Sequence, residues 1–269
     1  MMISGVAHAL SLDVPQRVTQ GGMITGFVTP PTANVTLNDT PLHVGRDGRI
    51  LFGVARDEQG PLRLTVTLHT KTLTKSLAVA PRAWSIQTIA GLPKKFVTPN
   101  PQQQARIKAD QAKIKTTRTA PITNDFLATD GFIKPAAGPI SGIFGSQRIL
   151  NGIPKAPHYG LDIAGPVGTP VVAPAAGVVA LVDPDMFLTG KTVMMDHGAG
   201  VYSVFIHLHD ISVQQGDTLQ AGSPLGTIGA TGRVSGPHLH WGVTVAGVQV
   251  DPARVLGRTE YGGPKTDGQ

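Results

Sequence analysis

Alternating hydrophobic and polar residues recur near both ends of the chain and predict a mainly β protein. The clearest example is residues 62–68, where leucine and valine occupy every second position and would form one face of a strand. Residues 72–79 can form the hairpin partner of this strand. Further short strands with Asn-, Asp- and Gly-rich turns lie between residues 10 and 80, and this regular spacing predicts a small β-sandwich-like domain.

One segment in the middle of the chain has a helical pattern instead. Asn100 can cap a helix whose first position is occupied by Pro101, and helix-forming residues continue to about residue 117. The Lys and Arg residues of this segment are interpreted as a solvated face rather than a binding patch. The helix is predicted to lie in a linker, residues 99–135, after an accessory β-domain, residues 1–98.

Strands and Gly/Pro turns return after the linker and predict an antiparallel β-sheet domain over residues 136–256. The remaining residues, 257–269, are polar and glycine-rich, and they are expected to form a loose tail. The best strand candidates in this domain are 171–173, 177–182, 191–196, 201–207, 224–228 and 238–245.

The composition indicates a folded protein and limits the metal ligands and partners that it can have. Hydrophobic residues make up 41% of the chain and charged residues 15%, which is typical of a protein with a packed core. The chain has no cysteine, so a transition-metal site must use His and carboxylate ligands. A net charge of +6 suits an anionic polymer, but aromatic residues are only 5%, so no nucleic-acid partner is expected. No apolar run is long enough for a transmembrane span.

Five of the nine histidines lie in three short segments, 158–162, 205–209 and 236–241. Residues two or four apart in a strand point to the same side of a sheet. The pairs that could share a face are His158 with Asp162, His207 with His209, and His238 with His240. Three strands of one sheet could therefore bring these polar side chains together, where burying them without a partner would cost a few kcal/mol each.

A zinc ion would satisfy such a cluster. Imidazole nitrogen and carboxylate oxygen are ordinary zinc ligands, and catalytic zinc has three protein ligands plus a water molecule. Taken singly, each pattern has a simpler interpretation: H-x-x-x-D occurs by chance on surfaces, H-x-H occurs in strands without metal, and His207 alone would be structural. Their combination in a cysteine-free sheet domain favours a metal-dependent hydrolase.

The second half of the chain resembles the lysostaphin-type zinc peptidases, the M23 or LytM-like family, over roughly residues 140–252. The matching stretches are 141–145 (SGIFG), 158–164 (HYGLDIA), 168–171 (GTPV), 173–179 (APAAGVV), 196–198 (DHG), 226–229 (GTIG) and 232–240 (GRVSGPHLH). The resemblance implies an antiparallel sheet with a zinc groove and a Zn²⁺ cofactor. It implies that His158, Asp162 and His240 are the zinc ligands, and that His207 and His238 are catalytic.

Some positions depart from the family pattern. Phe205 stands where the family often has Tyr, and His209 stands where Ser is common, so His209 competes with His207 for assignment. His197 matches a turn region and is interpreted as structural. The first half of the chain, including residues 84–87 and 91–93, loosely resembles an accessory domain found in some proteins of Gram-negative bacteria.

The resemblance implies an endopeptidase that cuts peptide cross-links or stem peptides of bacterial peptidoglycan. The bond between D-Ala and diaminopimelate is the expected target, with a glycine bridge as the second choice. A regulatory protein partner and a periplasmic or secreted location are also expected. Residues 6–10 fit a trimmed export signal or a chance pattern equally well. The alternatives are a non-catalytic wall-binding or regulatory module and, less favoured, a binding protein with incidental histidines.

Overall fold

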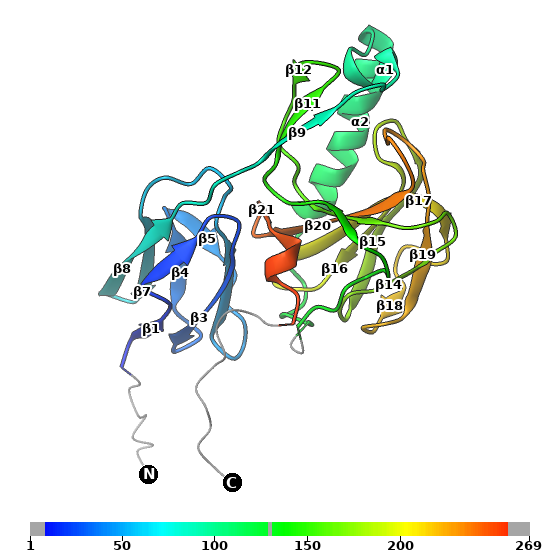
Figure 1. Cartoon of the computed structure of the whole chain (residues 1–269). Coiled ribbons are helices and arrows are strands. Elements are labelled where there is room, and N and C mark those ends of the chain that lie inside the picture. The colour runs from blue at the N-terminus through cyan, green and yellow to red at the C-terminus, as the bar shows by residue number, and fades with distance from the viewer. Residues whose placement is uncertain (1–8, 129–130, 258–269) are drawn as a thin grey trace.

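The computed structural model describes residues 9–128 and 131–257, which form two β-domains side by side with a long helix above the second (Figure 1). The expected loose tail, apart from Gly257, and most of the signal-like pattern at residues 6–10 lie outside the described residues. No described helix is both long enough and apolar enough to cross a membrane.

The N-terminal domain is the predicted β-sandwich. One sheet has the order β1-β3-β6 and the other has the order β2-β8-β7-β4-β5. Leucines and a valine on one face of β7 enter a single core together with Ile24 and Phe52 of the opposite sheet, which confirms the sandwich arrangement. The strands are β1 (Ser11–Asp13), β2 (Arg17–Thr19), β3 (Met23–Thr29), β4 (Asn34–Leu37), β5 (Thr40–Leu42), β6 (Arg49–Gly53), β7 (Leu62–Leu68) and β8 (Lys71–Ala80).

The C-terminal domain is built on an antiparallel sheet with the order β10-β13-β20-β17-β16-β15-β18, and β19 pairs with both β14 and β17. All six strand candidates named from the sequence in this domain are present. The strands are β10 (Ile140–Gly142), β11 (Gln147–Leu150), β12 (Ile153–Pro154), β13 (Leu161–Ala164), β14 (Pro170–Val172), β15 (Gly177–Met186), β16 (Gly190–Asp196), β17 (Val201–Ile211), β18 (Thr218–Leu219), β19 (Pro224–Ile228), β20 (His238–Val245) and β21 (Val248–Val250), followed by the 3₁₀ helix η1 (Pro252–Arg254).

The two faces of this sheet have different environments. Phe205, Leu239 and Trp241 lie on the inner face, in the main core. Met194 and Ile206 lie on the other face, in a smaller cluster against which Ile114 of the helix packs. A side chain near the middle of the sheet therefore points either into the main core or toward helix α2. The candidate site lies on the face that points toward the helix.

Two helices connect the domains, α1 (Lys94–Val97) and α2 (Pro101–Arg118). The predicted cap is present: Asn100 accepts from the backbone N–H of Gln103, and the Gln103 side chain accepts from the backbone N–H of Asn100. The strand before α1, β9 (Ile86–Ile89), pairs in parallel with β11 and so joins the C-terminal domain. The segment before the linker thus contributes to the surroundings of the site.

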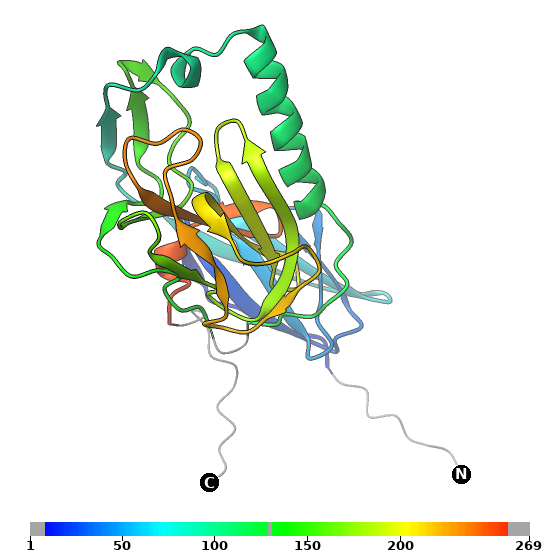
Figure 2. The same cartoon turned by 90° about the vertical axis from the view of Figure 1, so that its right-hand side faces the viewer.

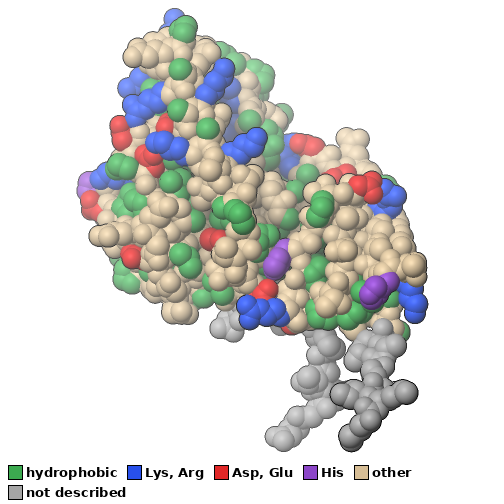
Figure 3. Space-filling model, turned by 180° about the vertical axis from the view of Figure 1, so that it is seen from behind, with side chains coloured by type: hydrophobic (Ala, Val, Ile, Leu, Met, Phe, Trp, Pro, Cys, Tyr) green, Lys and Arg blue, Asp and Glu red, His purple; other side chains and the backbone are tan. Residues whose placement is uncertain are grey.

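Helix α2 stands beside the β15–β16 hairpin (Figure 2) and is held mainly by polar contacts. None of its residues is buried. Arg106 and Lys113 pair with Asp185 and Asp183, both at 2.7 Å, and Asp110 accepts from the backbone N–H of Phe187 at 2.8 Å. Seen from behind, Lys and Arg side chains gather over the helical part of the molecule (Figure 3), in agreement with the solvated face expected from the sequence.

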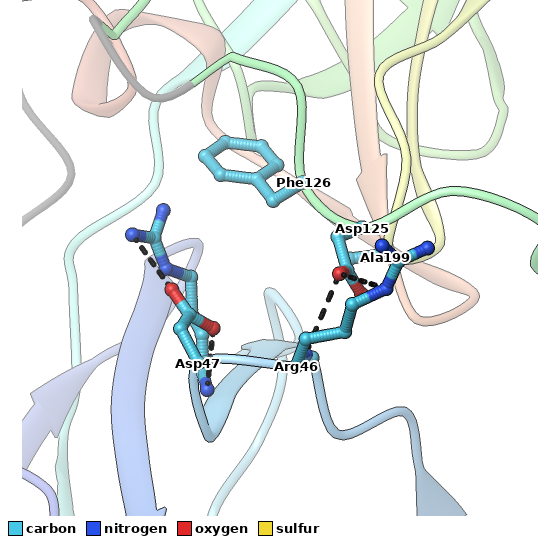
Figure 4. A pocket seen from close by; sticks show the side chains of 7 residues that line it. Arg46, Asp47, Asp125, Phe126 and Ala199 are labelled. Atoms are coloured by element: carbon cyan, nitrogen blue, oxygen red, sulfur yellow. Dashed lines mark hydrogen bonds and ion pairs between the residues drawn. The ribbon is translucent and has the colours of Figure 1, made fainter.

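The domains also contact each other directly. Met23 and Leu51 of the N-terminal domain belong to the main core of the C-terminal domain, and Arg82 forms an ion pair of 2.8 Å with the buried Asp251. On another side, Asp125 of the linker accepts from the backbone N–H of Arg46 and pairs with its guanidinium at 3.4 Å (Figure 4). These contacts fix the N-terminal domain against the sheet.

His197 is a structural residue of the core, as expected from the sequence. Its side chain is fully buried, and its Nδ1–H donates to the carbonyl of Ala176 at 2.7 Å. Its Nε2 accepts from the hydroxyl of Ser203 at 2.8 Å, and that hydroxyl accepts from the indole N–H of Trp241. Burial lowers the pKa of His197 to about 4.

The burial of His197 predicts that acid destabilises the fold. Since the pKa falls from 6.5 to about 4 on folding, the unfolded chain binds the proton first, and stability is lost as the pH falls from about 6.5 toward 4. The expected loss from this residue between pH 7 and pH 5 is roughly 2 kcal/mol in the free energy of unfolding. Urea unfolding of the His197→Gln variant should lack this part of the pH dependence. His209→Gln, which removes an exposed imidazole, is the control; equal pH dependence in wild type and His197→Gln would contradict the assignment.

Candidate metal centre

Three side chains bring one ligand atom each to a single point. His240 Nδ1 lies 2.7 Å from Asp162 Oδ1 and 2.8 Å from His158 Nε2, and the last two atoms are 2.9 Å apart. His158 and Asp162 are buried and His240 is nearly so. These are the three residues that the sequence resemblance implied as ligands, and the structure brings them together.

Two paired strands position the cluster. Asp162 in β13 lies directly opposite His240 in β20, so both side chains point to the same face of the sheet. Their neighbours Leu161 and Trp241 point into the core on the other face. His158 comes from the segment before β13, where its backbone N–H donates to the carbonyl of Ser146. The strand pair and this anchored segment together bring residues 158, 162 and 240 to one place.

A β-bulge brings His207 to the same face. In regular β17 alternation, Ile206 would share the face of His240 and His207 would point into the core. His207 instead has a φ of +66°. Between the pairs Phe205–Val193 and Leu208–Lys191, strand β17 has one residue more than β16, which is a β-bulge. Beyond the bulge, Leu208 is in the core. His207 therefore joins the face of Ile206, with its ring centroid 5.0 Å from that of His238.

Backbone carbonyls fix the orientation of three of the four histidines. The Nδ1–H groups of His158, His207 and His238 donate to the carbonyls of Ile143 (3.0 Å), Thr231 (2.8 Å) and Gly236 (2.9 Å). In a neutral imidazole this leaves Nε2 as the nitrogen with the lone pair. His158 Nε2 faces the cluster, and His238 Nε2 lies 3.9 Å from Asp162 Oδ1.

The donor set fits a cation. His158 Nε2 and Asp162 Oδ1 are both acceptors, and His240 Nδ1 can offer at most one proton to the pair. Burial raises the pKa of Asp162, but contacts with His158 and His240 outweigh it and hold that pKa well below its usual range. Burial lowers the pKa of His240 to about 4, so at neutral pH this imidazole is neutral and lies beside an ionised carboxylate. These are the protonation states that bind a divalent metal ion.

Two glycines leave room for the ligands. A Cβ atom on Gly160 would lie 2.5 Å from the His240 ring and 2.7 Å from the Trp241 carbonyl. A Cβ atom on Gly142 would lie 2.4 Å from Asp162 Oδ2. Both distances are below van der Waals contact, so the positions of the imidazole and the carboxylate depend on these glycines.

The cluster opens into two cavities. One, of about 110 Å³, is lined by Asp162, His207 and His238 together with Arg148 and Arg233. The other, of about 600 Å³, lies between α2 and the sheet; His240 is among its lining residues, with Ile114 and Ile206. The centre is therefore accessible along a cleft on the helix side of the sheet.

His209, the competitor for the role of His207, lies outside the cluster. Its side chain is 54% exposed, and its one ion pair among the described residues is to Asp210 at 3.7 Å. Sequence reasoning gave no role to Arg148 and Arg233, because single arginines carry no recognisable spacing. The same holds for Gln87, which reaches the cleft only through the pairing of β9 with β11.

Comparison with known proteins places these residues in a family context. Residues 156–252 match peptidase family M23. The chain is 40% identical over 114 residues to the peptidoglycan DD-endopeptidase ShyA of Vibrio cholerae, covering 42% of this chain and 26% of that protein. It is also 40% identical over 98 residues to the DD-carboxypeptidase/endopeptidase Mpg of Neisseria meningitidis, covering 36% and 22%. The chain thus spans about a quarter of the length of these curated relatives.

The similarity to one solved structure extends over both domains. The crystal structure of a candidate peptidase M23 from Pseudomonas aeruginosa superimposes with a TM-score of 0.69 and is 31% identical in sequence. The match covers 89% of this chain and 95% of that one, so it includes the N-terminal β-sandwich and the linker. On this evidence, the chain belongs to peptidase family M23.

Proposed function

We propose that this protein is a zinc-dependent endopeptidase that hydrolyses peptide bonds in bacterial peptidoglycan. In this proposal His158, Asp162 and His240 hold the zinc ion, and His207 and His238 act on the substrate. The observation that carries the proposal is the convergence of three lone-pair atoms within 2.7–2.9 Å of one another in a cleft that holds two further histidines.

The residues of the cluster suit peptide hydrolysis. A zinc ion with two imidazole ligands and one carboxylate ligand supplies Lewis acidity and lowers the pKa of water. Burial lowers the pKa of His207, so this imidazole is neutral at neutral pH and can accept a proton at Nε2. In the protonated form, His207 or His238 can donate a hydrogen bond to the oxygen of the tetrahedral intermediate or a proton to the leaving amine.

The relatives suggest the substrate. ShyA is named a peptidoglycan DD-endopeptidase and Mpg a DD-carboxypeptidase/endopeptidase. We infer the same polymer here, with a D,D bond such as that between D-Ala and diaminopimelate as the target and a glycine bridge as the second choice. This substrate implies an extracytoplasmic site of action. The N-terminal domain is proposed as an accessory module that could also bind a regulatory protein.

The alternative function is a wall-binding or regulatory module without catalysis. Such a module needs no intact set of metal ligands and no free imidazoles beside them. Here the three ligand atoms converge, and His207 is brought to them by a bulge with a left-handed residue, which a purely binding surface has no need of. These features favour an enzyme.

Two substitutions separate the metal ligands from the catalytic histidines. His240→Ala should lose both zinc and activity, because it removes a ligand. His207→Ala should keep one zinc per chain but lose roughly 10²-fold or more in turnover, because this residue acts on the reaction. Metal analysis and rates of fragment release from purified sacculi measure the two effects. His209→Gln is the control and should behave as wild type. A His207→Ala variant with near-wild-type rate would remove this residue from the mechanism.

The metal requirement and the substrate can be tested together. Sacculi incubated with the protein should release soluble fragments, and mass analysis should identify a cut D,D cross-link. A chelator should stop release and added zinc should restore it. Full release in the presence of a chelator that has removed the metal would rule out the zinc mechanism, whereas fragments cut at another bond would change only the target.

Gly160→Ala should weaken metal binding by at least about tenfold, since the added methyl group would overlap the His240 ring and the neighbouring carbonyl. Competition with a zinc indicator measures this change. Gly60→Ala adds the same methyl group where no atom lies within 4 Å, and it should bind zinc as wild type does. Unchanged affinity in Gly160→Ala would show that His240 does not depend on this close approach.

A further inference from the structure

The smaller cavity beside the metal centre carries an excess of positive charge. Arg148 and Arg233 both line it, and the only carboxylate among its lining residues is Asp162. That carboxylate is already in contact with His158 and His240 and is the proposed metal ligand. Two arginines therefore line a space of about 110 Å³ whose lining offers no carboxylate besides Asp162.

Neither arginine has a full set of hydrogen-bond partners among the described residues. Arg148 contacts Asp162 Oδ2 only at 3.4 Å, although its side chain is just 19% exposed, and its buried Nε has no hydrogen-bond partner. Within residues 9–128 and 131–257, no hydrogen bond or ion pair involves the guanidinium of Arg233. Burial lowers the pKa of Arg233, and the positive charge of Arg148 lowers it further. Such an arrangement is costly unless an anion occupies the space between them.

The cavity wall places this charge next to the reacting bond. His207 and His238 line the same space, so an anion held by the arginines would lie beside the two histidines that are proposed to act on the scissile amide. Arg148 is positioned by β11, which pairs with β9, and Gln87 of β9 also lines the cavity.

We propose that Arg148 and Arg233 form a carboxylate-binding subsite that selects peptides with a free carboxylate beside the bond that is cut. This inference rests on the proposed peptidase function and names its substrate class more closely. Guanidinium groups bind carboxylates by bidentate hydrogen bonds between opposite charges, whereas an amide in the same position has no negative charge and binds more weakly. Arg148 also contacts the proposed zinc ligand Asp162, so Arg233 is the better residue for a test.

The test compares two probes that differ only in this group, N-acetyl-L-lysyl-D-alanyl-D-alanine and its C-terminal carboxamide. Binding to the zinc-loaded protein is measured by calorimetry in a His207→Ala background, so that turnover does not consume the probe. The free acid should bind at least about tenfold more tightly than the amide. Adding Arg233→Gln should abolish this preference and Arg233→Lys should restore part of it, whereas Arg46→Gln, a remote and exposed arginine, should leave it unchanged.

An absent preference, or a preference that survives Arg233→Gln, would overturn the subsite. The cleavage of sacculi by the protein with His207 intact is measured separately. If sacculi are cut in a zinc-dependent way and the two probes bind equally, only the subsite is wrong. If sacculi are not cut at all, the proposed function fails, independently of the outcome of the binding comparison.

Discussion

The architecture of the site depends on the close approach of three lone-pair atoms. Nitrogen and oxygen acceptors at 2.7–2.9 Å repel one another unless a proton or a cation lies among them. The rest of the local structure serves to maintain this contact. The pairing of β13 with β20 aligns Asp162 with His240, glycines at 142 and 160 leave space for both side chains, and a backbone carbonyl orients His158. A divalent ion held among the three atoms would remove this repulsion.

Side chains alternate between the two faces of the sheet, so the core lies on one face and the proposed reacting groups lie on the other. His207 departs from this alternation and thereby joins the site. A regular strand would bury this imidazole beside Phe205 and Trp241. The bulge reverses the alternation for one residue and returns Leu208 to the core, so a histidine is added to the cleft without loss of apolar packing. A non-glycine residue at a φ of +66° is strained, and strain of this kind is characteristic of functional positions.

Much of this could be predicted from the sequence, because strands 62–68 and 238–245 and the capped helix at 101–118 have strong local signals. The identities of the five residues at the centre also followed from motif spacing and family resemblance. The bulge could not be predicted, since Phe-Ile-His-Leu-His continues an apparent alternation and the extra residue shows only in the pairing with β16. The short strands β9, β11 and β12 were missed because two to four residues carry too little periodicity.

The parallel pairing of β9 with β11 affects where a catalytic fragment of this protein can begin. One wall of the cleft comes from residues 86–92, which precede the linker helix and lie more than sixty residues before the segment that matches the peptidase family. A catalytic fragment cut at the linker would retain every proposed zinc ligand and lose that wall. Part of the cleft wall is thus encoded outside the segment that carries the proposed zinc ligands, and a change within residues 86–92 would alter the cleft without altering those ligands.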